Sequence, residues 1–382
     1  MADQMGTTNG TADVVVRLKR RMVEEALPLW STVGWDQAAG GFIDRLHIDG
    51  TADVAAPRRV FVQARQIYCF AKAAQMGWYP EGRAIALKGL EHLLSRAKAP
   101  DGRPGYVHRL TPEGEVLDGR RDSYDHAFIL FALASVYALD RDAQVRAEIE
   151  AVLGFLDDHL RSPHGGVHEG LPVTLPRRQN PHMHLFEAMI ACFDATHDLS
   201  FQNRAGEFFA LFLANLYDKQ RRVLGEYFEE DWSKIAPVSV EPGHQAEWVW
   251  LLKGFERITG CPTGTRRGEL LASALRYQDE ATGCLVDEGD DAGNIRRNTR
   301  RLWPQTEIAK AWIAQAESAE AGAADEARAA LERLERHYLS HPVRGGWYDQ
   351  FDSDGRSLIE TIPASSFYHV LCAVTEAEQV LG

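Results

Sequence analysis

A glycine-started turn recurs along this chain at nearly even intervals. Residues 40–45 read GGFIDR and residues 345–350 read GGWYDQ, each a glycine pair followed by an aromatic residue and an acid. Four weaker copies lie between them. The gaps along the series Gly40, Gly105, Gly165, Gly225, Gly283 and Gly345 are 65, 60, 60, 58 and 62 residues. An even period of this kind is typical of a repeat architecture, in which each repeat is one supersecondary unit.

Two helical patterns fill each interval between these turns. The patterns at 147–160 and 326–339 carry charges on one face, whereas those at 126–139 and 244–255 are apolar nearly all round. A helix with an apolar stripe covers a core, and a helix that is apolar all round is buried on every side. Outer and inner helices are therefore expected to pair as 12–31 with 60–77, 81–98 with 124–139, 142–161 with 180–197, 199–217 with 243–259, 266–277 with 303–316, and 321–339 with 363–380.

Six antiparallel helix pairs with a buried inner ring predict an all-α fold, an (α/α)6 barrel with short glycine-started hairpins between the pairs. The alternative is an open helical solenoid, but such repeats run roughly 34 to 47 residues and rarely carry a hairpin. We therefore expect a closed barrel. No stretch rich in proline, glycine or serine divides the chain. Residues 11–382 are predicted to form a single domain after a flexible N-terminal tail at residues 1–10.

The charge balance argues against two classes of partner. The net charge is −13 at pH 7, whereas a nucleic-acid binder needs a basic face. No run approaches the ~20 apolar residues that span a bilayer, so neither nucleic acid nor membrane is expected as a partner. The five cysteines are scattered and include no C-x-x-C pair, which is typical of unpaired thiols in a reducing cytoplasm. The expected protein is cytoplasmic, as a monomer or homodimer.

Polar side chains enter the otherwise apolar inner helices in their first turns. Buried polar groups are costly unless they have partners, and in a barrel of helix pairs the starts of the inner helices converge at one end. Three of these residues are His184, His244 and His369, from the third, fourth and sixth repeats. Their clustering predicts a polar pocket at that end. The other repeats contribute Arg59, Gln63, Arg65, Tyr124, Asp125, Trp303, Gln305 and Glu307.

Each histidine alone is more simply interpreted as a hydrogen-bonded core residue, but three at matching depth favour acid/base chemistry. A metal site is the alternative. His182 and His184 lie about 200° apart on a helix of 3.6 residues per turn, so they do not face one metal ion. The chain has no H-E-x-x-H or paired-cysteine motif, and no metal is predicted. Glu247 follows His244 by three residues on the same helix face, where a carboxylate can orient the ring and stabilise its charged form.

Five motifs occur in order along nearly the whole chain. They are R-x-x-x-Q-x-R at 59–65, N-P-x-M-H at 180–184, P-G-H-x-x-E-W-x-W-L at 242–251, W-P-Q-T-E at 303–307 and F-Y-H at 367–369. Together these motifs resemble the N-acylglucosamine 2-epimerase superfamily, which includes acylglucosamine and cellobiose 2-epimerases, D-mannose isomerases and sulfoquinovose isomerase. The fold that the resemblance implies is again an (α/α)6 barrel.

The resemblance also implies roles for residues of this chain. It implies a catalytic domain that needs no metal and no cofactor in its chemistry and takes a small-molecule sugar. His244 and His369 would be the acid/base pair, His184 would assist ring opening or hold a hydroxyl, and Arg59 would polarise the oxygens at C1 and C2. The residues expected to bind substrate are Asn180, Glu247, Trp303 and Glu307, together with Tyr124, for which the resemblance says less.

The leading prediction is an aldose–ketose isomerase of the D-mannose/D-fructose type, working through an enediol. Histidine suits such proton transfers because its unperturbed pKa of about 6.5 lies near working pH. The alternative is 2-epimerisation of a hexose, an N-acylhexosamine or a disaccharide through the same intermediate. Cellobiose epimerases tend to carry extra tryptophans in the fifth motif, where this chain has only Trp303 before Pro304. This difference disfavours a disaccharide.

Two hypotheses from other functional classes remain open. A glycoside hydrolase on the same barrel would need two carboxylates across the cleft, and Asp125, Glu247 and Glu307 could supply them. A non-catalytic helical scaffold would instead show an exposed apolar groove. The phosphorylation state of the sugar stays open, because several arginines either hold a phosphate or are solvated surface, which is the favoured interpretation. These arginines are Arg58, Arg177, Arg178, Arg296, Arg297, Arg300 and Arg301.

Overall fold

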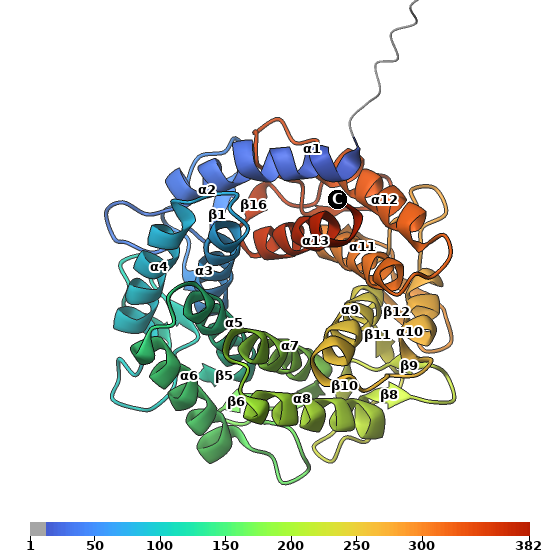
Figure 1. The fold of residues 1–382 in the computed structure, drawn as a ribbon, viewed down its shortest axis with the longest axis horizontal. Helices are drawn as coiled ribbons and strands as arrows, with labels where there is room; N and C mark the ends of the chain where they lie inside the picture. The colour runs from blue at the N-terminus through green and yellow to red at the C-terminus, as the bar shows by residue number, and fades with distance from the viewer. Residues whose placement is uncertain (1–12) are drawn as a thin grey trace, which may run out of the picture.

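The helices form two concentric rings in the computed structural model, which describes residues 13–382 (Figure 1). The predicted tail at residues 1–10 lies outside the described residues. The inner ring consists of α3 (Val60–Gln75), α5 (Ser123–Asp140), α7 (Gln179–Thr196), α9 (Pro242–Thr259), α11 (Leu302–Glu317) and α13 (Ser365–Leu381). Each begins within two residues of its predicted start.

The outer ring covers the inner one. Its members are α1 (Val14–Arg21), which continues through the π-helical turn η1 (Met22–Ala26) into α2 (Leu27–Thr32), α4 (Gly82–Ala97), α6 (Ala143–Phe155) with η2 (Leu156–Leu160), α8 (Leu199–Leu211) with η3 (Phe212–Leu216), α10 (Arg266–Leu275), and α12 (Ala323–Leu334) with η4 (Glu335–Leu339). Several helices begin where an aspartate accepts hydrogen bonds from free backbone N–H groups. Asp122 caps α5, Asp142 caps α6 and Asp198 caps α8.

The barrel is closed. Each inner helix contacts the next along the chain, and the last, α13, contacts the first, α3. The outer ring also closes, because α1 contacts α12. The closed (α/α)6 barrel predicted from the repeat is therefore confirmed, and the open solenoid is excluded.

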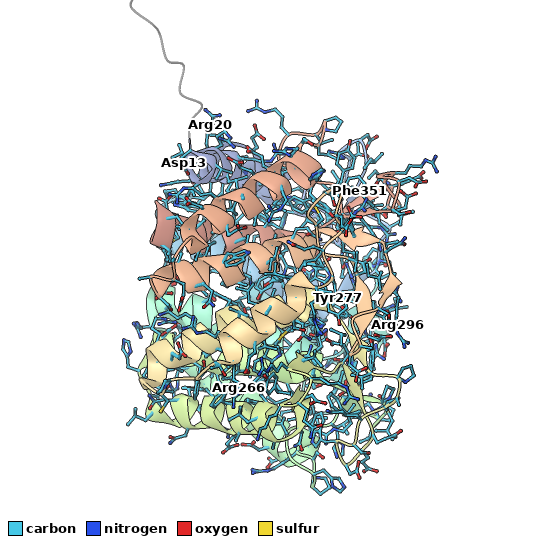
Figure 2. The ribbon with its side chains drawn as sticks, turned by 90° about the vertical axis from the view of Figure 1, so that its right-hand side faces the viewer. Asp13, Arg20, Arg266, Tyr277, Arg296 and Phe351 are labelled. Atoms are coloured by element: carbon cyan, nitrogen blue, oxygen red, sulfur yellow. The ribbon has the colours of Figure 1, made fainter. Side chains whose placement is uncertain are left out.

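Short antiparallel strands link the repeats at one end of the barrel. They are β1 (Arg45–His47), β2 (Arg58–Arg59), β3 (Arg109–Leu110), β4 (Val116–Asp118), β5 (Arg121–Asp122), β6 (Gly170–Leu171), β7 (Arg177–Arg178), β8 (Tyr217–Asp218), β9 (Val223–Leu224), β10 (Tyr227–Phe228), β11 (Ser239–Val240), β12 (Glu288–Asp290), β13 (Ile295–Arg297), β14 (Arg300–Arg301), β15 (Gln350–Phe351) and β16 (Thr361–Pro363). Figure 2 shows these segments gathered at one end, where Arg296 and Phe351 are labelled.

Most of this pairing runs between repeats. The strand before each inner helix pairs with the glycine-started segment of the following repeat, as β2 with β3, β5 with β6, β7 with β10, β11 with β12 and β14 with β15. The sixth pair joins β16 to β1, with Leu46 opposite Ile362, and closes the cycle. The strands therefore tie the six repeats into a ring at the end where the inner helices begin.

A side chain near the start of most inner helices holds the glycine-started segment of its own repeat. Gln63 accepts a hydrogen bond from the N–H of Phe42 and donates one to its carbonyl, both at 2.8 Å. Gln245 and Gln305 do the same in the fourth and fifth repeats. In the third repeat the ring of His182 takes this place and accepts from Val167 N–H at 3.1 Å. His182 is therefore a structural residue, and it faces away from His184 as the helical spacing predicts.

Five of the six repeated glycines have a positive φ, and Gly225 does not. Gly345 combines φ +79° with a close approach, because a Cβ there would lie 2.6 Å from the backbone carbonyl of Glu25. We expect Gly345→Ala to lower the free energy of unfolding by about 3 kcal/mol or more, the sum of backbone strain and overpacking. Gly355 has φ +81° and open space around it, so Gly355→Ala should cost only about 1 kcal/mol. Urea denaturation of both variants checks this, and equal losses would contradict it.

The arginines before the inner helices are not all solvated surface. Arg58, Arg177 and Arg300 are buried, and the surface interpretation is wrong for them. Arg58 pairs with Asp36 at 2.7 Å, and the other two donate to backbone carbonyls of the glycine-started segments. Each is followed by an arginine that is partly exposed. These three rim arginines are Arg59, Arg178 and Arg301.

All five cysteines are free, and four of them are buried. Over residues 13–382, no helix combines the length and the apolar character that crossing a bilayer requires. The cytoplasmic location and the monomeric or dimeric state stay predictions.

Candidate active site

Three histidines meet at the strand-bearing end of the barrel, in the first two turns of inner helices. His184 lies on α7, His244 on α9 and His369 on α13, and all three are buried. The sequence predicted this convergence from their matching depth in the repeats. Several other predicted site residues lie in the same helical turns, among them Tyr124, Asn180, Glu247, Trp303 and Glu307.

A carboxylate holds Nδ1 of each ring. Glu187 Oε2 lies 2.9 Å from Nδ1 of His184, and Glu226 Oε2 lies 2.9 Å from Nδ1 of His244. Glu307 Oε1 lies 2.8 Å from Nδ1 of His369. An ionised carboxylate only accepts, so Nδ1 of each ring carries the proton and Nε2 is the nitrogen left for substrate.

The environments of these rings drive their pKa values apart. Burial alone would lower the pKa of His244, but the carboxylates of Glu226 and Glu241 raise it to about 9. Burial lowers the pKa of His369 to about 3 and that of His184 to about 4. At neutral pH His244 is therefore charged, while the other two rings are neutral. Titratable groups held in opposite protonation states are what acid/base catalysis needs.

The indole of Trp303 lies beside the rings of both His244 and His369. Its ring centroid is 4.9 Å from that of His244 and 5.8 Å from that of His369. Unlike Trp248, which is buried, Trp303 is only half-buried. An aromatic face flanked by two imidazoles offers a sugar ring an apolar platform with proton donors and acceptors at its edges.

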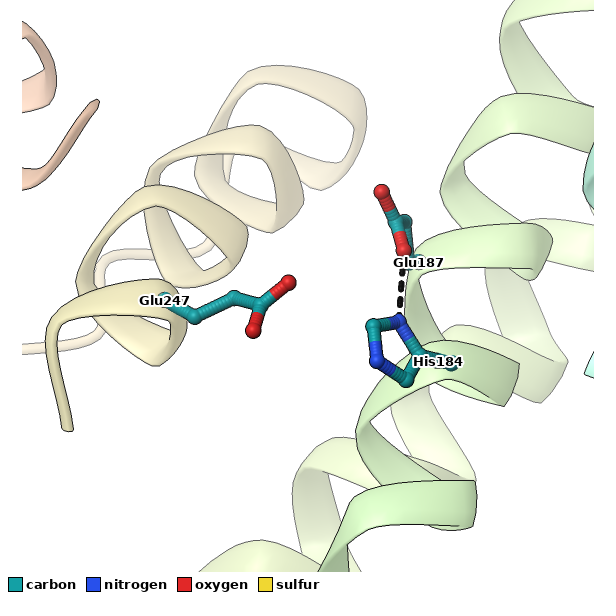
Figure 3. A group of neighbouring side chains, drawn as sticks. All are labelled: His184, Glu187 and Glu247. Atoms are coloured by element: carbon teal, nitrogen blue, oxygen red, sulfur yellow. Dashed lines mark hydrogen bonds and ion pairs between the residues drawn. The ribbon is translucent and has the colours of Figure 1, made fainter. Parts of the chain in front are cut away.

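Glu247 reaches from α9 toward the pair of His184 and Glu187 on α7 (Figure 3). One carboxylate oxygen of Glu247 lies with one side-chain atom each of His184 and Glu187 in a group whose atoms are all within 4.8 Å of one another. Glu247 forms a second group of the same size with Glu307 and His369. Burial and the charge of Glu307 raise the pKa of Glu247 well above its usual range. Its Oε1 is shielded from solvent and has no hydrogen-bond partner in the protein. Glu247 is therefore a buried carboxyl group whose surroundings favour its protonated form.

Asn180 shows the same feature. Its Oδ1 is buried and has no hydrogen-bond partner. Buried polar atoms are nearly always satisfied by protein, water or ligand. Oδ1 of Asn180 and Oε1 of Glu247 are therefore candidate contacts for a polar ligand, and the substrate-binding role that the resemblance implies for these residues stays a prediction.

Two arginines lie at different depths around the start of the first inner helix: Arg59 is the last residue of β2 and Arg65 lies on α3. Arg59 lies at the rim, where Asp44 binds its Nε at 3.0 Å and its Nη2 at 2.8 Å. Arg65 is buried, donates to the hydroxyl of Tyr124 at 2.8 Å and stacks on Tyr368 at 4.8 Å. Arg65 is thus packed among aromatic rings inside the barrel, while Arg59 is partly exposed at its rim.

An ion pair between Lys310 and Glu307 on α11 was not predicted from the sequence. Lys310 is fully buried, and its Nζ lies 2.7 Å from Oε2 of Glu307. Glu307 was predicted to bind substrate, but its two oxygens face His369 and Lys310. Burial would raise the pKa of Glu307, but Lys310 and His369 hold it below its usual value. Glu307 is therefore an ionised carboxylate inside the barrel.

Three groups of histidine and carboxylate come close enough to suggest a metal site in the described part of the chain. Their members are His184, Glu187 and Glu247; Glu226, Glu241 and His244; and Glu247, Glu307 and His369. In each group a hydrogen bond already joins the histidine to a carboxylate. In the third group Lys310 supplies the positive charge. We assign all three to hydrogen-bonded acid/base pairs, and the absence of a metal and of a cofactor stays a prediction.

A cavity of about 830 Å³ opens at the opposite end of the barrel, between the C-terminal halves of the inner helices. Four of its charged side chains form two pairs. Arg257 binds Asp194 at 2.7 Å, and Lys253 lies 3.8 Å from Glu317. None of His184, His244 and His369 lines this cavity, although Glu187, the partner of His184, does.

Comparison with known proteins agrees with this arrangement. The family model described as N-acylglucosamine 2-epimerase (GlcNAc 2-epimerase) matches residues 41–373. The chain belongs to the N-acylglucosamine 2-epimerase family. The protein is therefore an enzyme of the isomerase class, and the resemblance carried by the five motifs is confirmed.

Members of the family resemble this chain over most of its length. The mannose-6-phosphate isomerase of Rhizobium meliloti (strain 1021) is 35% identical over 381 residues, which cover 94% of this chain and 95% of that protein. The D-mannose isomerase of Thermobifida fusca is 26% identical over 313 residues, 74% of each chain. The solved cellobiose 2-epimerase from Bacillus thermoamylovorans B4167 has a TM-score of 0.84 at 19% identity, over 95% of this chain and 99% of that one, and so shares the fold.

One expectation about the partners of the site residues needs correction, and one partner was missed. Glu247 was expected to orient His244, but Glu226 does so, because the ring turns back toward the glycine-started segment while Glu247 extends toward α7. Glu226 stands in the repeated GEYF segment, where the acid of the repeat was a usable signal. His108, which binds Asp125 at 2.6 Å, was also missed. It occupies the place that an acid takes in other repeats.

Proposed function

We propose that this enzyme interconverts an unphosphorylated aldose and its ketose, of the D-mannose/D-fructose type, by proton transfer between C2 and C1. The observation that carries this proposal is the asymmetry of the two histidines around Trp303. His369 is neutral and His244 is charged at neutral pH, because Glu226 and Glu241 surround only His244. The names of two relatives, a mannose-6-phosphate isomerase and a D-mannose isomerase, support the same reaction class.

The asymmetry favours an isomerase over an epimerase. An isomerase needs one base that moves a proton from C2 to C1 on one face of the enediol. An epimerase moves a proton from one face of C2 to the other, so each histidine must serve as base in one direction. A histidine with a pKa of about 9 is a poor base at neutral pH, since it is already protonated.

The steps balance with the groups present. His184 assists opening of the sugar ring. Nε2 of His369 then removes the C2 proton, the electron pair forms the C1–C2 double bond, and O1 takes a proton from His244. The proton of O2 returns to His244 while His369 protonates C1, which gives the ketose. The charged His244 stabilises negative charge that develops on the two oxygens, and the role that the resemblance implies for Arg59 at C1 and C2 stays a prediction.

The charges at the entrance favour a neutral sugar over a sugar phosphate. Carboxylates already bind the three rim arginines, Arg59 through Asp44, Arg178 through Glu169 and Arg301 through Asp287. Two more acids, Asp122 and Glu241, lie within 4 Å of Arg178 and Arg301. A phosphate placed there would meet more carboxylates than free cations.

The test is to incubate EDTA-treated protein with D-mannose in D2O and to follow the products by proton NMR. We expect fructose in which part of the C1 hydrogen is deuterium, from exchange of the proton on Nε2 of His369 with solvent before it is returned to the sugar. Parallel samples contain mannose 6-phosphate, N-acetylglucosamine and cellobiose.

The products found in these samples distinguish the proposed reaction from its alternatives. Glucose labelled at C2 would replace the isomerase by the epimerase reading. Turnover of mannose 6-phosphate alone would contradict the argument from the entrance charges. If no sugar reacts or exchanges its C2 proton, the proposal is wrong, and release of a chromophore from aryl glycosides would then favour the hydrolase.

A further inference from the structure

Lys310 is a buried cation that the reaction as described does not use. It lies on α11 one turn after Glu307, and its side chain has no exposed surface. Nζ is 2.7 Å from Oε2 of Glu307 and 3.8 Å from the ring centroid of Trp250. A lysine in such a place is expensive to bury unless its charge is balanced. Its ion pair with Glu307 supplies that balance.

Glu307 connects this lysine to the catalytic base. Its Oε2 faces Lys310, and its Oε1 accepts the Nδ1 proton of His369 at 2.8 Å. Lys310, Glu307 and His369 thus form a continuous chain of contacts that joins α11 to α13. Of these three groups only the imidazole reaches the face of the pocket where Trp303 lies, with centroids 5.8 Å apart.

We propose that Lys310 is a positioning residue: it keeps Glu307 ionised, and Glu307 in turn holds His369 as the Nδ1–H tautomer with Nε2 free to remove the substrate proton. This inference rests on the proposed function, in which His369 is the base. It assigns Lys310 a role in the reaction without contact with the sugar.

The ring nitrogen of His369 that carries the proton decides whether this residue can act as the base. A carboxylate accepts from Nδ1–H and leaves Nε2 as the basic nitrogen. A protonated Glu307 would instead donate to Nδ1, so that Nε2 would carry the hydrogen and could not remove a proton. Without Lys310, three buried acids would share this part of the barrel with no cation beside Glu307. Either Glu307 or His369 would then take up a proton, and both outcomes remove the base.

The other charged and titratable groups around Lys310, Glu307 and His369 come from every neighbouring inner helix. They are Arg65 on α3, Glu187 on α7, His244 and Glu247 on α9, and Tyr368 and Cys372 on α13. Lys310 is the cation that contacts Oε2 of Glu307, the oxygen that does not bind His369. Burial and the charge of Glu307 raise the pKa of Glu247, which disfavours a second ionised carboxylate beside Glu307, and the ion pair with Lys310 stabilises the ionised form of Glu307.

Lys310→Met keeps the length of the side chain and removes its charge. We expect kcat near neutral pH to fall by about 10²-fold or more, within the range for loss of a general base or of its tautomer. Activity should recover as the pH rises, because the extra proton leaves the Glu307–His369 pair at higher pH. A purely structural role would lower kcat equally at all pH values.

A second substitution makes the test sharper. In the double variant Glu307→Gln/Lys310→Met, the amide oxygen of Gln accepts from Nδ1–H without needing a cation. We expect its kcat to exceed that of Lys310→Met by at least about 10-fold, with Lys253→Met, at the opposite end of the barrel, as the unaffected control. Thermal unfolding of each variant separates loss of folded protein from loss of chemistry.

Two results would overturn the inference: a Lys310→Met enzyme whose pH profile matches the wild type, or a double variant less active than Lys310→Met. Nitrogen-15 NMR of labelled histidines gives a readout that does not need turnover. The His369 signal, assigned by its loss in His369→Asn, should show a proton on Nδ1 and none on Nε2 in the wild type, and a proton on Nε2 in Lys310→Met at neutral pH. The proposed function fails separately, if the wild type does not convert mannose. Lys310 is then tested on whichever sugar the wild type turns over.

Discussion

Replacement of His369 by asparagine is expected to lower kcat by about 10²–10⁴-fold, the usual contribution of a general base. The ring is neutral at neutral pH because burial lowers its pKa to about 3. Its Nδ1 is held by Glu307 at 2.8 Å, so Nε2 is the nitrogen oriented for the proton transfer. Asparagine fills part of the same space and can still bond to Glu307, but it has no basic nitrogen. Steady-state kinetics with mannose measure the loss.

Exchange of the C2 proton separates the base from the acid. In D2O, His369→Asn should lose washout of the C2 proton together with turnover, since no group remains to remove it. His244→Asn should lose turnover but keep slow washout, because His369 still reaches C2 while O1 lacks its proton donor. Loss of washout in His244→Asn alone would reverse the two roles.

His182→Gln is the matched control. His182 is two residues from His184, yet its ring holds the backbone of Val167, the task that glutamine performs in three other repeats. The variant should keep both the fold and kcat. A loss as large as that of His369→Asn would mean that any change to a buried histidine disrupts the barrel, and the kinetic argument would fail.

The helical part of the fold could be predicted closely from the sequence. The helix pairs follow from a period of about 60 residues with an apolar inner helix in each interval, and apolar periodicity is a strong signal over 12 to 18 residues. The first inner helix was expected at 60–77 and is observed as Val60–Gln75. Repetition helped, because each weak pattern was supported by five others.

The strand ring could not be predicted in the same way. No described strand exceeds three residues, and two or three residues carry no readable alternation of side chains. The predicted hairpins are therefore mostly pairs between neighbouring repeats, such as Arg58 opposite Leu110. This arrangement depends on closure of the barrel, which brings β16 back to β1.

The histidines of the site were predictable, but their partners were less so. The depth of His184, His244 and His369 in the repeats predicts that they converge. Glu226 stands 18 residues before His244, and only the turn of the chain between β10 and α9 brings them together. Lys310 has the pattern of a surface lysine, one turn after a glutamate. The sequence signal for the burial of Lys310 was its position on a helix that carries apolar residues on every face.

Glu226→Gln is expected to move the alkaline limb of the kcat profile by two pH units or more toward lower pH. The reaction needs a charged His244, and that charge is lost as the pH rises through the pKa of the ring. In the wild type the pKa is about 9, because Glu226 and Glu241 outweigh burial. Gln still accepts from Nδ1–H, so the tautomer is kept, but burial then dominates and lowers the pKa.

The size of this effect depends on the pH at which it is measured. If the pKa of His244 falls to about 7 or below, the charged fraction at pH 8 drops about 10-fold, whereas at pH 5 it changes little. Wild-type kcat should stay flat from pH 5 to 8, since His369 loses its neutral form only near pH 3. Full pH profiles of kcat for both proteins measure the shift directly.

Two further variants separate the charge of Glu226 from its position in the repeat. Glu169 occupies the same place in the third repeat but binds Arg178 at 2.5 Å rather than a histidine, so Glu169→Gln should leave the alkaline limb unchanged. Glu241 lies 3.9 Å from His244, and Glu241→Gln should give a smaller shift in the same direction. An unchanged limb in Glu226→Gln would show that the charged form of His244 is not the acid. The asymmetry that favours an isomerase over an epimerase would then be lost, since both histidines could serve as bases.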